Sequence, residues 1–145
     1  MAMTTTELLT QAVERATATM NEFANGNPAP WKQQCSHQDD VTIFGGFGGY
    51  ERGWHQVGPR YEWASKRFES AEMTYENIST VVTPDLAYTV GLERYSAHLA
   101  GQAEPEVMVL RVTHVFRRED GAWKVTHRHA DALTVKQEAA ANVQR

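Results

Sequence analysis

Four side chains that can do chemistry lie close together near the C-terminal end of the sequence. The segment RVTHVFRREDGAWKVTHRHAD, residues 111–131, ends with His127, Arg128, His129 and Asp131. Histidine exchanges protons near neutral pH and also binds metals, so the cluster could serve acid–base catalysis or metal coordination. The alternative is that both histidines are hydrogen-bonded side chains of a pocket wall. We take His127 and His129 as the candidate acid–base catalysts.

The sequence contains no complete pattern for a metal or a cofactor. A metal needs three or four ligands, and nothing near the two histidines completes a recognised spacing. The glycine-rich stretch GGFGG, residues 45–49, lacks the GK[ST] ending and the β-α-β context of a phosphate-binding loop. We interpret it as a bend or bulge in a strand, and we predict neither a metal nor a cofactor.

A tight turn at residues 119–121, EDG, decides which side chains share a face of the sheet. A two-residue Asp-Gly loop would place His114 opposite His127 and gather three histidines on one face. A three-residue loop would pair Thr113 with His127 and turn His114 to the other face. We favour the three-residue loop, because it leaves apolar side chains on both faces of the sheet.

An arginine and several aromatic residues are candidates for ligand contacts. Arg111 pairs with His129 in the favoured register, and a buried guanidinium needs an anionic partner, either a carboxylate such as Glu93 or an acidic ligand. Four tryptophans, two of them expected in the core, could also line a flat apolar site. The predicted ligand-binding residues are Arg111, Thr113, Trp123, Tyr61 and Trp63.

The bulk properties are those of one soluble globular domain spanning residues 1–145. Hydrophobic residues make up 41% and charged residues 22% of the chain. The net charge of −4 argues against nucleic-acid binding, which needs a basic face. A lone cysteine, Cys35, suits a reducing compartment and is expected to be a packing residue. Residues 1–10 lack the features of a signal peptide and no apolar run could span a membrane, so we expect a cytoplasmic protein that does not bind membranes.

The periodicity of apolar residues predicts helices first and a sheet afterwards. Thr4 and Glu7 have the spacing of a capping box at the start of an amphipathic helix. Pro30 could open a short second helix, and a third begins at Trp54, with Pro59 tolerated only in its first turn. Strands are predicted around 41–44, 71–83, 86–98, 105–118 and 122–134, followed by a loose tail at 136–145. This order predicts an α+β fold with helices on one face of a mostly antiparallel sheet.

The chain resembles the SnoaL-like branch of the nuclear transport factor 2-like superfamily, which includes ketosteroid isomerase and polyketide cyclases. The resemblance rests on PWKQQCSHQDDVTIFGGFGGYERGW at 28–54, DLAYTVGLERY at 85–95 and LRVTHVFRREDGAWKVTHRHAD at 110–131. It implies a cone-shaped fold in which the helices pack on a curved sheet. It also implies a homodimer formed through the outer sheet face, and a funnel whose wall includes Arg111, Thr113, Trp123, His127 and His129.

The resemblance does not transfer a catalytic residue. Related isomerases and cyclases use an aspartate in the pocket, and the only candidate here is Asp40, which precedes the first strand. We therefore carry two hypotheses. The first is an isomerase, cyclase or dehydratase that works by acid–base chemistry on a hydrophobic oxygenated molecule. The second is a non-catalytic module that binds a small apolar or carboxylate-bearing molecule, or that serves dimeric assembly.

Overall fold

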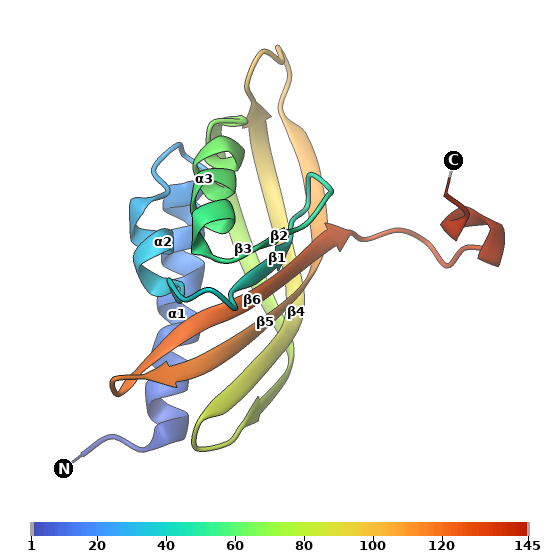
Figure 1. Cartoon of the computed structure of the whole chain (residues 1–145). Helices are drawn as coiled ribbons and strands as arrows, with labels where there is room; N and C mark the ends of the chain where they lie inside the picture. Colours follow the sequence, from blue (N-terminus) through green and yellow to red (C-terminus); the bar gives the residue numbers. More distant parts are fainter. Residues whose placement is uncertain (1, 145) are drawn as a thin grey trace.

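The computed structural model describes residues 2–144, and a curved sheet with helices on one face forms its body (Figure 1). The helices are α1 (Thr5–Phe23), α2 (Ala29–Gln34) and α3 (Trp54–Ser65). The strands are β1 (Thr42–Phe44), β2 (Glu51–Arg52), β3 (Phe68–Val82), β4 (Leu86–Leu99), β5 (Glu106–Glu119) and β6 (Ala122–Ala132). A short 3-10 turn, η1 (Ala139–Asn142), lies in the C-terminal tail, which projects away from the body in Figure 1.

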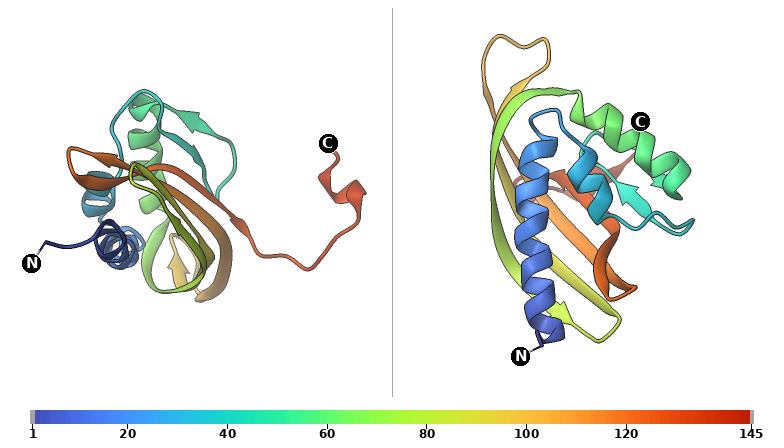
Figure 2. Two further views of the ribbon diagram at one scale, coloured as in Figure 1. Left: turned by 90° about the horizontal axis from the view of Figure 1, so that it is seen from below. Right: turned by 90° about the vertical axis from the view of Figure 1, so that its left-hand side faces the viewer.

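Helix α1 begins with the predicted capping box. The Glu7 backbone N–H donates to the Thr4 hydroxyl at 3.0 Å, and the Thr4 N–H donates to the Glu7 carboxylate at 3.1 Å. These two bonds satisfy donors that the first turn of a helix leaves free. The predicted apolar stripe faces the sheet, so that Leu9, Ala12 and Met20 are buried. Figure 2 shows α1 running along the sheet with α2 beside it, and α3 comes near the C-terminal end of α1.

The six strands form one sheet in the order β2-β1-β6-β5-β4-β3. All neighbours are antiparallel except β1 and β6, which run parallel. The four long strands follow one another in the chain and curve around the helices (Figure 2). The predicted α+β class and mostly antiparallel sheet are confirmed.

The predicted register of the last hairpin is wrong. The loop contains two residues, Asp120 and Gly121, with φ angles of 51° and 80°, and Glu119 pairs with Ala122. Both positive φ angles belong to the type I′ turn that suits the twist of a hairpin. A bulge then shifts the pairing, because Phe116 pairs with Val125 whereas Val115 pairs with His127.

The bulge changes which side chains enter the core. On the turn side of it, Trp123 and Val125 point inward, and beyond it Arg128 and Ala130 do so. Inward and outward side chains therefore do not alternate strictly along β6. Thr126, at the bulge, is also buried. A strict two-residue period would have placed His127 on the face of Val125.

Helix α3 differs from expectation at its proline. Pro59 lies inside the helix and not in its first turn. As the sixth residue of α3, Pro59 cannot donate the backbone bond that this position of a helix normally makes. None of the helices within residues 2–144 is long and apolar enough to cross a lipid bilayer.

Candidate ligand-binding site

A small cavity lies between the helices and the inner face of the sheet. Its volume is about 60 Å³, enough for roughly four to six water molecules. The wall is mainly apolar, and α1, α3, the β1-β2 loop and four long strands all contribute to it. The side chains that matter below are Met20, Arg60, Tyr61, Tyr95, Met108 and Arg128.

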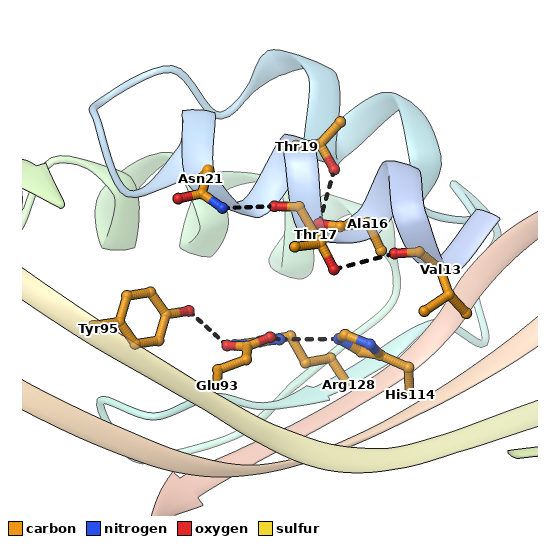
Figure 3. Close-up of polar contacts among 9 residues, drawn as sticks. All are labelled: Val13, Ala16, Thr17, Thr19, Asn21, Glu93, Tyr95, His114 and Arg128. Atoms are coloured by element: carbon orange, nitrogen blue, oxygen red, sulfur yellow. Dashed lines mark hydrogen bonds and ion pairs between the residues drawn. The ribbon is translucent and has the colours of Figure 1, made fainter. Parts of the chain in front are cut away.

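A buried polar network adjoins the cavity beneath α1 (Figure 3), and two of its members, Arg128 and Tyr95, line the cavity. The Arg128 guanidinium donates to both carboxylate oxygens of Glu93, each at 2.8 Å. It also donates to Nε2 of His114 at 2.9 Å, and the Tyr95 hydroxyl donates to the Glu93 carboxylate. All four residues are buried, with Glu93 only 1% exposed. The bonds fix the direction of each polar group in a region without solvent.

The charges of this network are set by the contact between Glu93 and Arg128. Burial alone would raise the pKa of Glu93, but the Arg128 guanidinium outweighs burial and holds that pKa below its ordinary value. Burial likewise opposes the charge on Arg128, and Glu93 overcomes it and raises the Arg128 pKa. The carboxylate and the guanidinium are thus both ionised, and the pair carries no net charge.

His114 is neutral in this environment. Burial and the neighbouring Arg128 charge lower its pKa from 6.5 to about 3. Because arginine can only donate hydrogen bonds, the Nε2 atom that faces Arg128 must be unprotonated. The single ring proton is therefore on Nδ1.

The two tyrosines that line the cavity, Tyr61 and Tyr95, and the adjacent Glu93 do not exchange protons near neutral pH. Burial raises the pKa of both tyrosines, Tyr61 and Tyr95, well above the ordinary value, and Glu93 raises that of Tyr95 further. The Glu93 carboxylate is a weak base because three hydrogen bonds stabilise its charge. The cavity offers apolar contact and hydrogen-bond donors but lacks a poised acid or base.

Of the predicted ligand-binding residues, Tyr61 lines this cavity. Trp63 does not line it but contacts the lining residue Phe47, at a centroid distance of 5.7 Å. Trp123 is buried elsewhere, where its indole N–H donates to the carbonyl of Thr5 at the start of α1. The cavity is too small, as it stands, for a steroid-sized molecule.

The other predicted site residues lie together on the outer face of the sheet. Arg111 and Thr113 pair across β5 and β6 with Asp131 and His129, and none of them lines the inner cavity. Arg111 donates two hydrogen bonds to the Asp131 carboxylate, at 2.7 and 2.9 Å. Its expected partner, Glu93, is paired with Arg128 instead.

His127 also lies on the outer face, because the bulge turns it away from the core. Its Nδ1 atom is 2.7 Å from the hydroxyl of Thr42 on the neighbouring strand β1. Burial and the adjacent His129 lower the pKa of His127. A catalytic role for the two histidines stays a prediction, and the structure separates both from the cavity.

The outer face is hollowed where these residues gather. An open hollow of about 550 Å³ is bordered by Arg111, Thr113, His129 and Asp131 together with aliphatic side chains from three strands and the tail. Asp40, the candidate pocket aspartate, lies elsewhere and forms an ion pair with Arg117 at 2.7 Å. Among residues 2–144 there is no group of three or more possible metal ligands.

The sequence does not predict the inner network as a unit, although Glu93 is a candidate carboxylate partner for a buried arginine. Glu93 had a usable signal, since it alternates in β4 with the buried residues Ala87, Thr89 and Tyr95. An acidic residue on the buried face of a strand requires a partner. Arg128 could not be assigned as that partner, because the bulge that turns it inward leaves no mark in the sequence.

The comparisons with known proteins agree with this architecture. A family model described as a SnoaL-like domain matches residues 4–133. The chain belongs to the SnoaL-like family. No curated protein matches the chain at a significant level.

Solved structures with this fold are numerous but distant in sequence. A nuclear transport factor 2-like protein from Salmonella enterica is 16% identical, with a TM-score of 0.77 over 93% of this chain and 94% of that one. A candidate dehydratase from Streptomyces avermitilis is 18% identical, with a TM-score of 0.75 over 89% and 96%. A candidate ketosteroid isomerase from Shewanella frigidimarina is 22% identical, with a TM-score of 0.67 over 85% and 94%. At these identities the likeness concerns the fold alone.

Proposed function

We propose that this SnoaL-like protein binds a small apolar molecule in the cavity between the helices and the sheet. The observation that carries the proposal is the cavity itself, an apolar space that ends at a fixed guanidinium. Arg128 uses three of its five N–H donors on Glu93 and His114. The remaining donors suit one acceptor oxygen on an otherwise apolar ligand.

The electrostatics favour binding without proton transfer. An isomerase or dehydratase of the kind found in this superfamily needs a group that takes or gives a proton at the bound substrate. The pKa values of Tyr61, Tyr95 and Glu93 are all shifted away from neutrality. The solved relatives named after such enzymes therefore support a pocket in this chain more strongly than they support a reaction.

The direct test is the binding of a small neutral probe. Hexanamide has an aliphatic chain and one strong acceptor, and calorimetric titration would measure its dissociation constant. We expect saturable binding that the substitution Ala64→Phe abolishes, because Ala64 lines the cavity and a larger side chain would fill it.

A matched control separates filling of the cavity from a general effect of added bulk. Ala122→Phe places the same ring at an exposed position beside the hairpin turn and should leave binding unchanged. Absence of binding to the unsubstituted protein, or equal binding by the Ala64→Phe variant, would contradict the proposal.

A second proposal concerns the outer face, on which two copies would associate as a homodimer. It is supported by exposed apolar side chains on a surface that carries the open hollow. Ile78 is 60% exposed, Leu133 46% and Tyr88 40%. Apolar side chains gathered on one face of a sheet are typical of an interaction surface.

A further inference from the structure

We infer that the ligand of the cavity carries an anionic group, which Arg60 and Arg67 bind at the cavity mouth. This inference rests on the proposed function, since it names the chemical class of the molecule that the cavity takes. Arg60, Trp63 and Arg67 follow one another at a spacing of three and four residues, in α3 and directly after it. They therefore lie on one side of the helix.

The two guanidinium groups pack against the exposed indole of Trp63. Their central carbons lie 4.0 Å and 4.6 Å from its ring centroid, and Trp63 is 40% exposed. Stacking of this kind holds a guanidinium in place while its N–H edge stays available. Because both guanidinium groups are already held in place, ligand binding would cost little further side-chain entropy.

Both guanidinium groups have donors to spare. Arg60 lies 3.4 Å from the Glu51 carboxylate through Nε, and this is its one ion pair among the described residues. The guanidinium of Arg67 packs on the Trp63 indole, and its side chain forms no hydrogen bond or ion pair with residues 2–144. Arg111 and Arg117, by contrast, each hold a carboxylate through two bonds. The mouth therefore keeps a positive charge that Glu51 only partly offsets.

The two arginines lie at the cavity and at a surface hollow next to it. Arg60 lines the cavity directly, and so does Phe47 of the β1-β2 loop. Phe47 also borders an open surface hollow of about 320 Å³, together with Arg67, Leu99 and Gln102. A molecule whose apolar part fills the cavity would thus project its other end past Phe47 toward Arg67.

The charge distribution decides which end of the ligand is anionic. At the inner end the charge of Arg128 is already balanced by Glu93. A buried carboxylate there would meet the Glu93 carboxylate and lose its own hydration. At the mouth, an anion keeps part of its water and gains charge-assisted hydrogen bonds from Arg60 or Arg67. The ligand class is therefore a short carboxylic acid whose aliphatic or aromatic body can also carry an acceptor oxygen toward Arg128.

Three probes of nearly equal shape test the inference. Hexanoate, hexanamide and hexylammonium share a chain and differ in the charge of the end group. We expect hexanoate to bind about tenfold more tightly than hexanamide at low salt, and hexylammonium to bind more weakly than either. The advantage of hexanoate should shrink as salt rises from about 0.02 to about 0.5 M, because the mouth is exposed.

The variant that tests the assignment is Arg67→Gln, since the exposed Arg67 has no structural partner among the described residues. It should remove most of the hexanoate advantage and leave hexanamide binding unchanged. Arg60→Gln and the double variant should act in the same direction. Arg118→Gln is the matched control, because Arg118 stacks on Trp123 at 5.2 Å, and Trp123 does not line the cavity.

Each result has a distinct meaning. If hexanamide binds and hexanoate binds no better, or if Arg67→Gln and Arg118→Gln lower hexanoate affinity equally, the anion site is overturned while the binding function stands. If none of the three probes binds, the proposed function fails and the anion site fails with it.

Discussion

At the scale of single residues, Arg128 organises the inner end of the cavity. Its guanidinium binds both Glu93 and His114. Without it, the buried Glu93 carboxylate would lack an opposite charge, and Nε2 of His114 would lack a hydrogen-bond donor. The net stabilisation by such a pair is small, since both ions lose their hydration. Removal of only one of the two ions is costly, because the other ion stays buried without an opposite charge.

Replacement of Arg128 tests this dependence. We expect Arg128→Met to lower the free energy of unfolding by about 3 to 5 kcal/mol, because Glu93 is left charged and buried. Urea unfolding followed by circular dichroism would measure the change. The exposed pairing residue Arg111 is the control, and Arg111→Met should have a much smaller effect. If the double variant Glu93→Leu/Arg128→Met is no more stable than Arg128→Met alone, the buried charge is not the cause.

His114 should make the stability fall with acidity. Its pKa is 6.5 in the unfolded chain and about 3 in the folded protein. As the pH falls below about 6.5, the unfolded chain takes up a proton that the folded protein does not. Stability contributed by neutral His114 is therefore complete above about pH 6.5 and is lost progressively toward pH 3, by up to about 1.4 kcal/mol per pH unit.

The variant His114→Gln should flatten this dependence. Glutamine can still accept a hydrogen bond from Arg128 but does not titrate. Urea unfolding at pH 7, 6, 5 and 4 would compare the two proteins, and the His127 contribution cancels because both retain it. Equal slopes between pH 6 and 4 would show that His114 is not buried in its neutral form.

At the scale of elements, the sequence predicts the long periodic segments and misses the bulge in β6. The capping box of α1 and the four long strands follow from apolar spacing and turn residues, because each is a local pattern. The bulge in β6 is not local, since it depends on how the strand packs under α1 and beside β1. That single residue of shift moved His127 and His129 to the outer face and Arg128 to the inner one.

Strand pairing also depends on the close approach at Gly91. A Cβ atom at this position in β4 would lie 2.5 Å from the backbone oxygen of Glu76 and from the hydroxyl of Tyr75. We therefore expect Gly91→Ala to lower the free energy of unfolding by about 1 to 3 kcal/mol, through overpacking.

Gly45 is the control for this substitution, because a Cβ there would meet no atom within 4 Å. Gly45→Ala should leave the protein equally or slightly more stable. Thermal unfolding of both variants would compare them. Equal stability of Gly91→Ala and the unsubstituted protein would mean that β3 and β4 are less tightly packed than the structure indicates.

At the scale of the whole molecule, the two faces of the sheet form two different surfaces. Its inner face, covered by the helices, encloses the cavity, and its outer face carries exposed apolar side chains and the open hollow. The SnoaL-like fold could be predicted from residue patterns along nearly the whole chain. The cavity and its lining could not, because they depend on side chains that meet from eight different segments.

The proposed homodimer is tested by a charge placed on the outer face. Val90 and Leu92 border the hollow there, and Leu92→Arg would place like charges opposite each other in a symmetric interface. We expect sedimentation velocity to give a dimer for the unsubstituted protein and a folded monomer for Leu92→Arg. Glu72→Arg, at an exposed position of β3 away from the hollow, should remain a dimer. A monomeric unsubstituted protein would contradict the proposal.

Methionine methyl NMR tests the central claim, ligand binding in the inner cavity, most directly. Met20 and Met108 line the cavity, whereas Met3 and Met73 do not. On titration with hexanamide, we expect saturable shifts of the Met20 and Met108 methyl signals with one dissociation constant, while those of Met3 and Met73 stay in place. Unchanged Met20 and Met108 signals at saturating hexanamide would contradict this claim.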